Sequence, residues 1–352
     1  MPTLHLIRVR RLLMLCLSCV LSLFIIERAF AEDAEGKSPP VWPTDPSVWL
    51  NTSPLTWEQL SGKGVVLYYF SCDPEGAADL PKVIEAARTH AVDPVILIGV
   101  TMGNTRQETE AYLKTIGFQW PVLCDPVYSF THLTDKALES EESNLLSECL
   151  TGVCYVTATG VIDEGDWEDP KSTFKDVLEG AAWITDPKDI PAPVLPAWRA
   201  VELKKYAEAL PLLKKGVNAG SNEQKEAARQ LQQVVLKEIE RLVGEARAAD
   251  EQDQKWNAYR KIGRILDEFR GYDIPKDLEP LQKKLAKTSQ VKQGLTAEKQ
   301  LGIAAQGLKS PNAVLRKKAE VQLEKIVADF PESDLAKNAR KLIDDSQQKS
   351  KK

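Results

Sequence analysis

The sequence is poor in the residues from which metal and nucleophile sites are built. It has three histidines and six cysteines among 352 residues, and no Cys-x-x-Cys pair stands beyond residue 31. His90 and His132 do not stand among cysteines and acidic residues in a ligand pattern, which argues against a zinc site. The acidic cluster from Asp163 to Asp169 is typical of a solvated turn. Because a glycine-rich phosphate loop and a nucleophile elbow are also missing, we expect no bound cofactor and no metal.

The first 31 residues have the pattern of a bacterial signal peptide. Three arginines precede the apolar run Leu12 to Ile26, and Ala29-Phe30-Ala31 supplies the small-x-small pattern of a cleavage site. The run of about 15 residues is shorter than the ~20 that span a bilayer. We therefore expect cleavage before Glu32 and export, to the periplasm or outside the cell. An uncleaved anchor and lipoprotein processing at Cys16 or Cys19 are the alternatives.

Length and charge set the broad class of the protein. The chain is longer than one hydrophobic core usually serves, so we expect two folded units. Its content of 43% hydrophobic and 28% charged residues is near the average for globular proteins. Without the first 31 residues it has 42 basic and 50 acidic side chains, a net charge near −8. A nucleic-acid partner is not expected, because that binding depends on neutralising phosphates with lysine and arginine.

Apolar runs typical of buried strands alternate with helical patterns between residues 48 and 184. This alternation predicts βαβ units, with a central mixed sheet flanked by helices. Residues 32–47 are polar and contain four prolines, which predicts a disordered leader. The expected strands are Val65–Phe70, Pro94–Val100, Pro121–Cys124, Val153–Thr157 and Val161–Ile162, and the expected helices are Leu80–Thr89, Arg106–Ile116 with Asn104 as its cap, Asp135–Cys149 and Ser172–Ile184.

The second half of the chain has an all-helical pattern. Residues 185–196 contain four prolines and predict a stiff, extended linker. Residues 197–347 have apolar side chains at helical spacing, and residues 348–352 are expected to be a disordered tail. Arg264–Phe269 recurs in character as Lys325–Phe330, each followed by a polar turn and another helix. The recurrence favours stacked helix pairs of a TPR-like kind, with an irregular bundle as the alternative.

Residues 48–184 carry a family likeness. Trp49–Thr56 together with Leu60–Phe70 resembles the opening of exported thioredoxin-like proteins of the TlpA/ResA type, within the AhpC/TSA and redoxin superfamily. Asp79-Leu80-Pro81 is similar to the acidic-Leu-Pro that follows their active-site cysteines, and Phe118–Pro126 is similar to a later strand. The resemblance implies a thioredoxin-like fold and thiol-disulfide oxidoreductase activity.

The resemblance also implies a pair of cysteines at a helix N-terminus, where the helix dipole lowers the pKa of the attacking thiol. This sequence has only Cys72-Asp73-Pro74-Glu75 at that place. Glu75 stands where the second cysteine is expected, and its negative charge would raise the pKa of the thiol. Cys72 is the candidate attacking thiol, and Cys149 and Cys154 are the candidate resolving thiols. The alternative is that Cys154 is a packed strand residue.

Two functions follow from these observations. The first is an exported oxidoreductase-like protein with a degenerate, single-cysteine motif, which would act on a protein thiol or disulfide. The second is a redox-inactive thioredoxin-fold scaffold whose helical domain binds a protein partner. The TPR-like segment Lys204–Leu210 motivates the second hypothesis.

Overall fold

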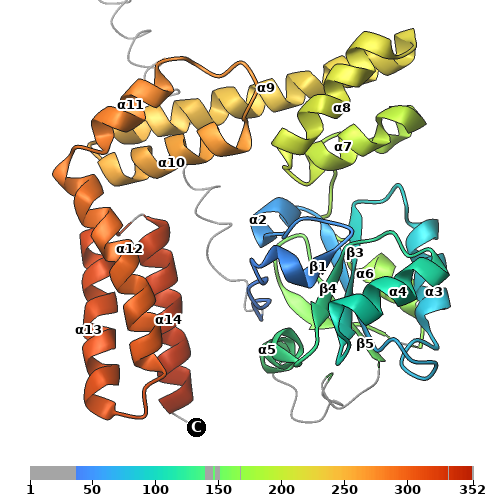
Figure 1. Ribbon diagram of the computed structural model, residues 1–352, viewed down its shortest axis with the longest axis horizontal. Helices are drawn as coiled ribbons and strands as arrows, with labels where there is room; N and C mark the ends of the chain where they lie inside the picture. Colours follow the sequence, from blue (N-terminus) through green and yellow to red (C-terminus); the bar gives the residue numbers. More distant parts are fainter. Residues whose placement is uncertain (1–36, 139–145, 147–150, 167, 332, 351–352) are drawn as a thin grey trace, which may run out of the picture. The chain divides into compact units, whose positions relative to one another are not determined.

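The computed structural model describes residues 37–138, 146, 151–166, 168–331 and 333–350. The chain divides into two compact units, one ending at Ile184 and the other beginning at Thr185 (Figure 1). The predicted signal peptide, residues 1–31, and the candidate resolving thiol Cys149 lie outside the described residues. Among the helices that are described, none combines the length and the apolar character needed to cross a membrane.

The first unit is built on a six-stranded mixed sheet with the order β1-β4-β3-β2-β5-β6. The central strand β2 is parallel to β3 and antiparallel to β5, and β3 is parallel to β4. This is the thioredoxin-like arrangement that the sequence predicted, a mixed sheet flanked by helices. The strands are β1 (Trp49–Leu50), β2 (Gly64–Phe70), β3 (Val95–Met102), β4 (Val122–Asp125), β5 (Thr151–Val156) and β6 (Ile162–Glu164).

Helices cover both faces of this sheet. The face formed by Val66, Tyr68 and Phe70 packs against α3, α4 and α6 in one apolar core. The opposite face carries Tyr69, whose hydroxyl lies 2.7 Å from Thr134 of α5. The helices of this unit are α2 (Trp57–Leu60), α3 (Leu80–Thr89), α4 (Arg106–Ile116), α5 (Ser129–Leu138) and α6 (Pro170–Asp176).

Two helices and one helix cap differ from the prediction. The bounds of α4 are as expected, but its cap is Thr105, which forms a capping box with Glu108, and not Asn104. Helix α5 begins at Ser129 and not at Asp135, because buried Asp125 accepts hydrogen bonds from the backbone N–H and the hydroxyl of Thr131 and so organises its first turn. Helix α6 ends at Asp176, where the chain continues in turns.

The described part of the predicted leader, residues 37–47, is held on the first unit by Trp42 and by hydrogen bonds to its backbone. Trp42 is 3% exposed and stacks on Phe130 with ring centroids 4.7 Å apart. The indole N–H groups of two other tryptophans, Trp49 and Trp57, donate to backbone carbonyls of this segment at 2.9 and 2.7 Å. The prediction of disorder was wrong for residues 37–47. It rested on the average composition of the segment, which does not show that a single tryptophan packs on the rest of the unit.

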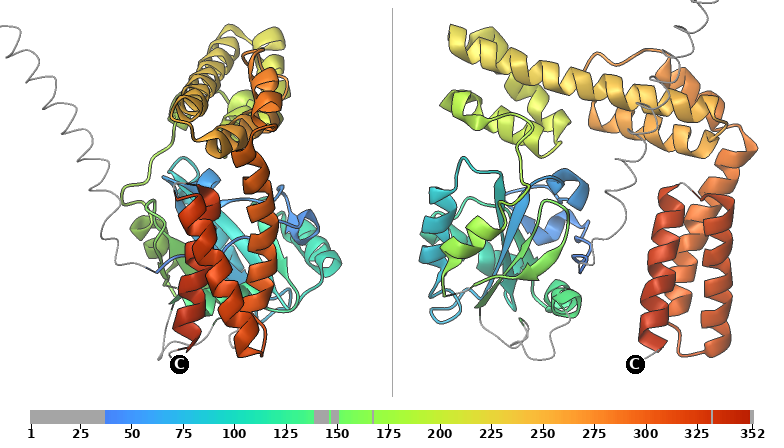
Figure 2. Two further views of the ribbon diagram at one scale, coloured as in Figure 1. Left: turned by 90° about the vertical axis from the view of Figure 1, so that its left-hand side faces the viewer. Right: turned by 180° about the vertical axis from the view of Figure 1, so that it is seen from behind.

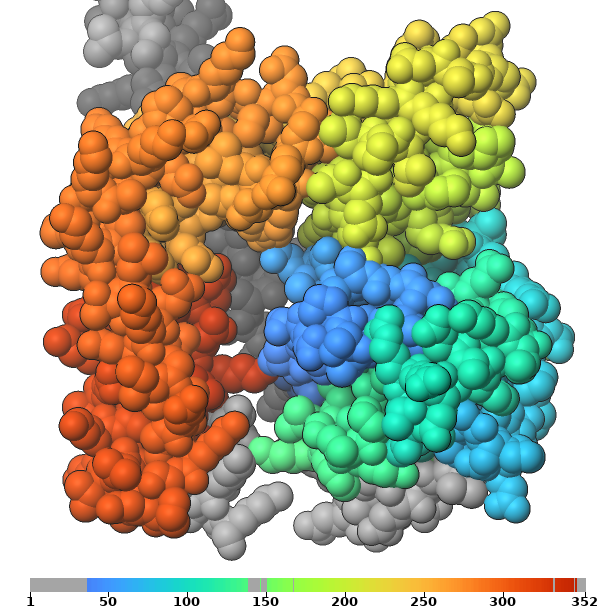
Figure 3. All heavy atoms as spheres, in the orientation of Figure 1, coloured from blue at the N-terminus to red at the C-terminus, as the bar shows by residue number. Residues whose placement is uncertain are grey.

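The second unit consists of helices packed side by side along the chain. Figure 2 shows the 30-residue helix α9 running beside α8 along one part and beside α10 along another. The last three helices form an antiparallel bundle that is coloured orange to red in the space-filling view (Figure 3). The helices are α7 (Leu195–Glu202), α8 (Tyr206–Ala219), α9 (Asn222–Glu251), α10 (Lys255–Glu268), α11 (Leu278–Leu285), α12 (Ser289–Leu308), α13 (Ala313–Asp329) and α14 (Asp334–Ser350).

Two predictions about connecting segments were wrong. Residues 185–196 are not an extended linker, because they form two 3₁₀ turns and the first residues of α7, with Ile190 and Val194 buried. Proline suits the first position of such turns, where its missing N–H has no role. The tail predicted to be disordered from residue 348 continues α14 as far as Ser350.

The two aromatic residues of the imperfect repeat have equivalent positions. Phe269 follows the last residue of α10 and Phe330 follows the last residue of α13, and each is the C-cap of its helix. Phe269 is fully buried and stacks on Tyr206 at 4.5 Å. Phe330 meets the edge of Trp256 at 6.2 Å. Each phenylalanine thus joins its helix end to an earlier helix of the unit.

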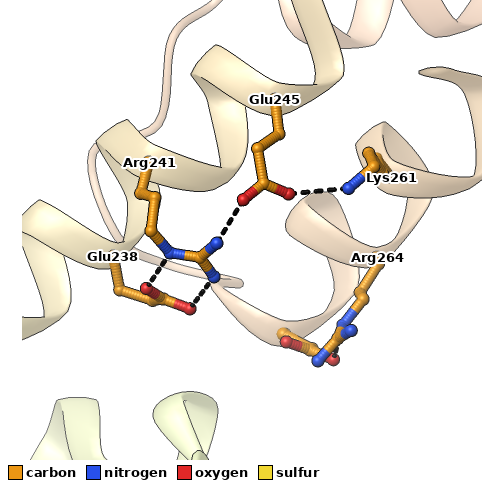
Figure 4. A network of polar contacts seen from close by, with 6 residues as sticks. Glu238, Arg241, Glu245, Lys261 and Arg264 are labelled. Carbon is orange, nitrogen blue, oxygen red and sulfur yellow. Dashed lines mark hydrogen bonds and ion pairs between the residues drawn. The ribbon is translucent and has the colours of Figure 1, made fainter. Parts of the chain in front are cut away.

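A network of ion pairs joins α9 to α10 (Figure 4). Arg241 donates two hydrogen bonds of 2.7 Å to Glu238 and also pairs with Glu245. Glu245 in turn accepts a 2.6 Å hydrogen bond from Lys261 of the next helix. The pairs of Arg241 lie within α9, and the pair of Glu245 with Lys261 connects α9 to α10.

Candidate functional site

The loop after the central strand is organised by Asp73. Its carboxylate accepts hydrogen bonds from the backbone N–H groups of Glu75 and Gly76 at 3.0 and 2.9 Å, and from the hydroxyl of Ser71. These hydrogen bonds to the charged form lower the pKa of Asp73. Cys72 therefore lies just beyond the carboxyl end of β2, in a turn that the hydrogen bonds of Asp73 stabilise.

Cys72 is not at the start of α3. That helix begins at Leu80, with a series of turns between it and the cysteine. The neighbouring helix start is that of α4: the backbone N–H of Cys72 donates to the side-chain carbonyl of Asn104 at 2.8 Å. The expectation of a helix N-terminus at Cys72 was wrong, because residues 74–79 form turns before α3 begins.

The sulfur of Cys72 is half-buried and points toward a pair of threonines. Its Sγ lies 4.0 Å from Oγ1 of Thr109, which is 3.0 Å from Oγ1 of Thr101. Cys124 lies beside Thr101, because these two residues are paired in the register of β3 with β4. Both threonines are fully buried. Thr109 and Cys124 were not among the candidate site residues, because their burial beside Cys72 follows from the fold.

The electrostatics of this environment oppose thiolate formation. Burial raises the pKa of Cys72 to about 11, against the opposite effect of the Thr109 hydroxyl. The acidic neighbours that raise the pKa further are Glu108 and Asp73, and not Glu75 as the sequence suggested. Redox-active cysteines have a lowered pKa instead. Cys72 thus has the environment of a packed thiol.

Cys154 is not placed to resolve a disulfide on Cys72. It pairs with Leu67 in the β2–β5 register and is fully buried. Successive side chains of a strand point to opposite faces of the sheet. Leu67 and Cys72 are an odd number of residues apart, so Leu67 and its partner Cys154 lie on the face opposite to that of Cys72. Burial raises the pKa of its thiol well above the usual range. Its position is that of the packed strand residue.

Cys124 lies on the same side of the sheet as Cys72, since both belong to the apolar core that contains Val66 and Phe70. Each of the two thiols also lies beside the hydroxyl of Thr109. Cys72, Cys124 and Cys154 are all free cysteines. Cys149, the other candidate resolving thiol, lies outside the described residues.

Thr151 lies next to the carboxyl end of β2. This residue begins β5 opposite Phe70. Its hydroxyl donates to the hydroxyl of Tyr68 at 3.1 Å and to the carbonyl of Tyr69 at 3.2 Å. The side chain of Thr151 therefore has a structural role, because it hydrogen-bonds to β2.

Histidines and acidic residues have structural partners. His90 is 2.7 Å from Asp93 and stacks on Phe174. In the acidic cluster, Asp166 accepts backbone hydrogen bonds from Glu168 and Asp169 at 2.9 and 3.0 Å, which makes it the cap of a turn. No group of three or more histidine, cysteine, aspartate or glutamate side chains that could hold a metal occurs within the described ranges.

No family model matches the chain, and no curated protein matches it at a significant level. Solved structures are similar to its N-terminal part. A thiol:disulfide interchange protein of the thioredoxin family from Chlorobium tepidum TLS is 16% identical with a TM-score of 0.34, covering 42% of this chain and 99% of its own. A secreted disulfide oxidoreductase from Mycobacterium tuberculosis is 12% identical (TM-score 0.29, coverage 38% and 96%). The thioredoxin domain of a thiol-disulfide oxidoreductase from Bacteroides vulgatus is 13% identical (TM-score 0.30, coverage 40% and 97%).

Proposed function

We propose that this chain is an exported protein in which the thioredoxin-like unit is a non-catalytic platform and the helical unit binds a protein partner. The observation that carries the proposal is the environment of Cys72. Its sulfur packs beside Thr109, its pKa is raised to about 11, and it forms no disulfide with the other described cysteines.

The raised pKa has a direct kinetic consequence. With a pKa of about 11, roughly one thiol in ten thousand is ionised at pH 7, because each pH unit below the pKa lowers the thiolate fraction tenfold. Only the thiolate attacks a disulfide. Turnover by Cys72 would therefore be slow even with a suitable substrate.

The helical unit supports the second part of the proposal. Its helices pack mainly on their neighbours along the chain, as in repeat proteins whose stacked helices form extended binding surfaces. The TPR-like segment that motivated this hypothesis begins α8, where Tyr206 is buried against Phe269. The export step is supported by the sequence pattern of residues 1–31 alone.

A second candidate function is a slow, single-thiol oxidoreductase. The partial exposure of Cys72 at the carboxyl end of β2 favours it, because ligands of open α/β sheets bind beyond that edge. In this function the sulfur would form mixed disulfides with a substrate, and a thiol from outside the described residues would release them.

An insulin-reduction assay with dithiothreitol as the electron donor distinguishes the two functions. We expect the wild-type protein, Cys72→Ser and the matched control Cys154→Ser to give the rate of dithiothreitol alone. A wild-type rate clearly above that background, lost in Cys72→Ser and retained in Cys154→Ser, would establish the oxidoreductase function instead.

Site-specific photocrosslinking in cells tests the binding function. A photoreactive amino acid replaces either Leu212 of α8 or Val92 of the first unit, two aliphatic side chains that are 39% and 49% exposed. We expect a discrete protein adduct from position 212 that also forms in the Cys72→Ser background. If both positions yield only the same diffuse background, the helical unit has no specific partner there.

A further inference from the structure

Two of the described thiols have one hydroxyl as a common neighbour. The Sγ atom of Cys72 lies 4.0 Å from Oγ1 of Thr109, and the thiol of Cys124 is hydrogen-bonded to the side chains of Thr101 and Thr109. The two threonine hydroxyls are 3.0 Å apart. Both cysteines are free. The fully buried Thr109 thus lies between a sulfur from the loop after β2 and a sulfur from β4.

The loop after β2 reaches across the end of β3. The backbone N–H of Cys72 donates to the side chain of Asn104 at 2.8 Å, and Asn104 follows β3 in the chain. On the other side of β3, Thr101 pairs with Cys124 of β4. Cys72 packs against the apolar core that contains Cys124 and Phe70. Cys72 is therefore displaced from the line of β2 toward β4, although β3 lies between these two strands.

The two cysteines differ in access and in freedom to move. Cys124 is 3% exposed and belongs to a strand whose backbone is paired with β3. Cys72 is half-buried in a bend outside the sheet, and its sulfur is the more accessible of the two. A disulfide needs α-carbons within about 7 Å, and the loop of Cys72 is the part that can adjust to that distance. This asymmetry suits a reaction in which one thiol meets the reagent and the other displaces it.

We propose that Cys72 and Cys124 form a reversible disulfide when the protein meets a disulfide oxidant. The bond joins the loop after β2 to β4 and withdraws both sulfurs from exchange with other molecules. This modification goes beyond the proposed function and does not depend on it, because a non-catalytic platform needs no disulfide and the helical unit does not contain these cysteines.

The reaction consists of two successive thiol-disulfide exchanges. The thiolate of Cys72 attacks one sulfur of an oxidant RSSR, which forms a mixed disulfide and releases RS⁻. The thiolate of Cys124 then attacks the sulfur of Cys72, which forms the internal disulfide and releases the second RS⁻. The protons of the two protein thiols pass to the two released thiolates. The protein loses two electrons and the oxidant gains them, so one RSSR becomes two RSH.

The surroundings favour a disulfide over a metal ion held by the same two thiols. Copper(I) is a soft cation that thiolates bind, but its complex with two thiolates keeps a net negative charge. Burial opposes such a charge, as it raises the pKa of both thiols, and Glu108 and Asp73 raise the pKa of Cys72 further. A disulfide is neutral and leaves no charge beside the apolar core.

Mapping of disulfides by mass spectrometry in the full protein tests the proposal. The protein is equilibrated with mixtures of oxidised and reduced glutathione, the remaining thiols are trapped with N-ethylmaleimide, and the peptides are analysed without reduction. We expect a peptide pair that joins Cys72 to Cys124 and disappears when reduced glutathione is in excess. Little glutathione should remain on Cys72, because the second exchange removes it.

Two matched pairs of variants locate the reaction. Cys124→Ser should leave about tenfold more glutathione on Cys72 than the wild type has, since a thiol held nearby reacts faster than one from solution. The control Cys154→Ser should keep the wild-type pattern. Thr109→Val removes a hydroxyl that lowers the pKa of both thiols, so the bond should form about threefold more slowly. Thr115→Val is its control, because Thr115 is an exposed residue of the same helix.

Three outcomes would overturn the proposal. These are equal amounts of glutathione on Cys72 in the wild type and in Cys124→Ser, a disulfide of Cys72 with a cysteine other than Cys124, and a wild-type protein in which both thiols stay reduced in a large excess of oxidised glutathione. Circular dichroism checks the fold of each variant, and Cys124→Ala replaces Cys124→Ser if the buried hydroxyl unfolds the protein. Photocrosslinking at position 212 is a separate measurement, so either proposal can fail without the other.

Discussion

The side-chain carbonyl of Asn104 accepts a 2.8 Å hydrogen bond from the backbone N–H of Cys72. This bond joins the loop after β2 to the loop before α4 and holds the sulfur of Cys72 against Thr109. The candidate site is thus built by two loops that lie side by side because β2 and β3 are adjacent and parallel. Both the burial of the sulfur and its raised pKa depend on this arrangement.

The first prediction concerns the pH dependence of Cys72 alkylation. In a Cys124→Ala, Cys149→Ala, Cys154→Ala background, the rate with iodoacetamide should rise about tenfold per pH unit from pH 7 toward a midpoint of about 11. In denaturant the midpoint should return to about 8.5. A folded-state midpoint at or below that of the denatured protein would contradict the burial of this sulfur.

The second prediction concerns Asn104→Ala. The substitution leaves the Cys72 N–H without its acceptor, which we expect to destabilise the first unit by about 1 kcal/mol. The freed loop should expose the sulfur and raise its alkylation rate at fixed pH. Asn312→Ala is the matched control, because Asn312 caps the remote helix α13, and it should leave the alkylation rate unchanged. Equal rates in both variants would mean that Asn104 does not position the loop.

The third prediction concerns Trp42. Trp42→Ala should lower the free energy of unfolding of the first unit by about 3–5 kcal/mol, because it removes a large buried side chain. Trp42→Phe should cost far less, since the buried indole Nε1 has no hydrogen-bond partner among the described residues. Val41→Ala, at a side chain that is 64% exposed, should change little. Denaturant unfolding followed by circular dichroism gives all three values.

The fourth prediction compares two glycines in α12. A Cβ at Gly294 would overlap the ring of Trp256, whereas a Cβ at Gly302 would meet nothing within 4 Å. Gly302→Ala should stabilise the second unit by about 0.5–1 kcal/mol, because alanine favours helix. Gly294→Ala should destabilise it by about 1–3 kcal/mol through overpacking. The melting temperatures should move in opposite directions, and a stabilised Gly294→Ala would refute the close packing on Trp256.

The fifth prediction concerns the pair Glu245 and Lys261, which connects α9 to α10 at 2.6 Å. A double-mutant cycle with Glu245→Gln and Lys261→Met should show a coupling of about 0.5 kcal/mol at low salt. Partial burial opposes ionisation of Glu245, but Lys261 and the neighbouring arginines hold its pKa below the usual value. The coupling should thus be complete above the unfolded-state pKa of about 4.3 and disappear as the pH falls below it.

A coupling near zero at neutral pH and low salt would show that the network of Figure 4 does not stabilise this helix pair. A coupling that persists at pH 3 would contradict the assignment of the effect to the ionised carboxylate. The cycle at about 1 M salt is the internal control, because screening should remove most of an exposed ion pair.

Secondary structure was predictable wherever a local pattern determined it. The run Val65–Phe70 has no polar alternation, and β2 is buried on both faces. Helix α4 has the predicted bounds, because a capping box begins it and Gly117, with φ of 64°, ends it. The cap itself was assigned one residue early, since both Asn104 and Thr105 suit that position and only the fold shows that Asn104 binds Cys72 instead.

Elements that depend on distant partners were missed. The two-residue strand β1 exists because it pairs with β4 more than 70 residues later in the chain. Residues 37–47 are ordered because the ring of Phe130 offers Trp42 a stacking partner. Neither partner can be identified from the composition of the segment itself.

The spacing of apolar side chains along the chain was enough to predict the class of the fold, the alternation of strands and helices in the first unit and the helical character of the second. The amino-acid order also has one cysteine, Cys72, where the resemblance implies a pair. Which sulfurs share a face depended on contacts between segments that are distant in the chain. The register of β2 with β5 places Cys154 on the other side of the sheet, and the pairing of β3 with β4 places Cys124 on the same side as Cys72. Strand order and register arise from contacts between distant segments, and these contacts decide whether a thiol is exposed, paired or packed.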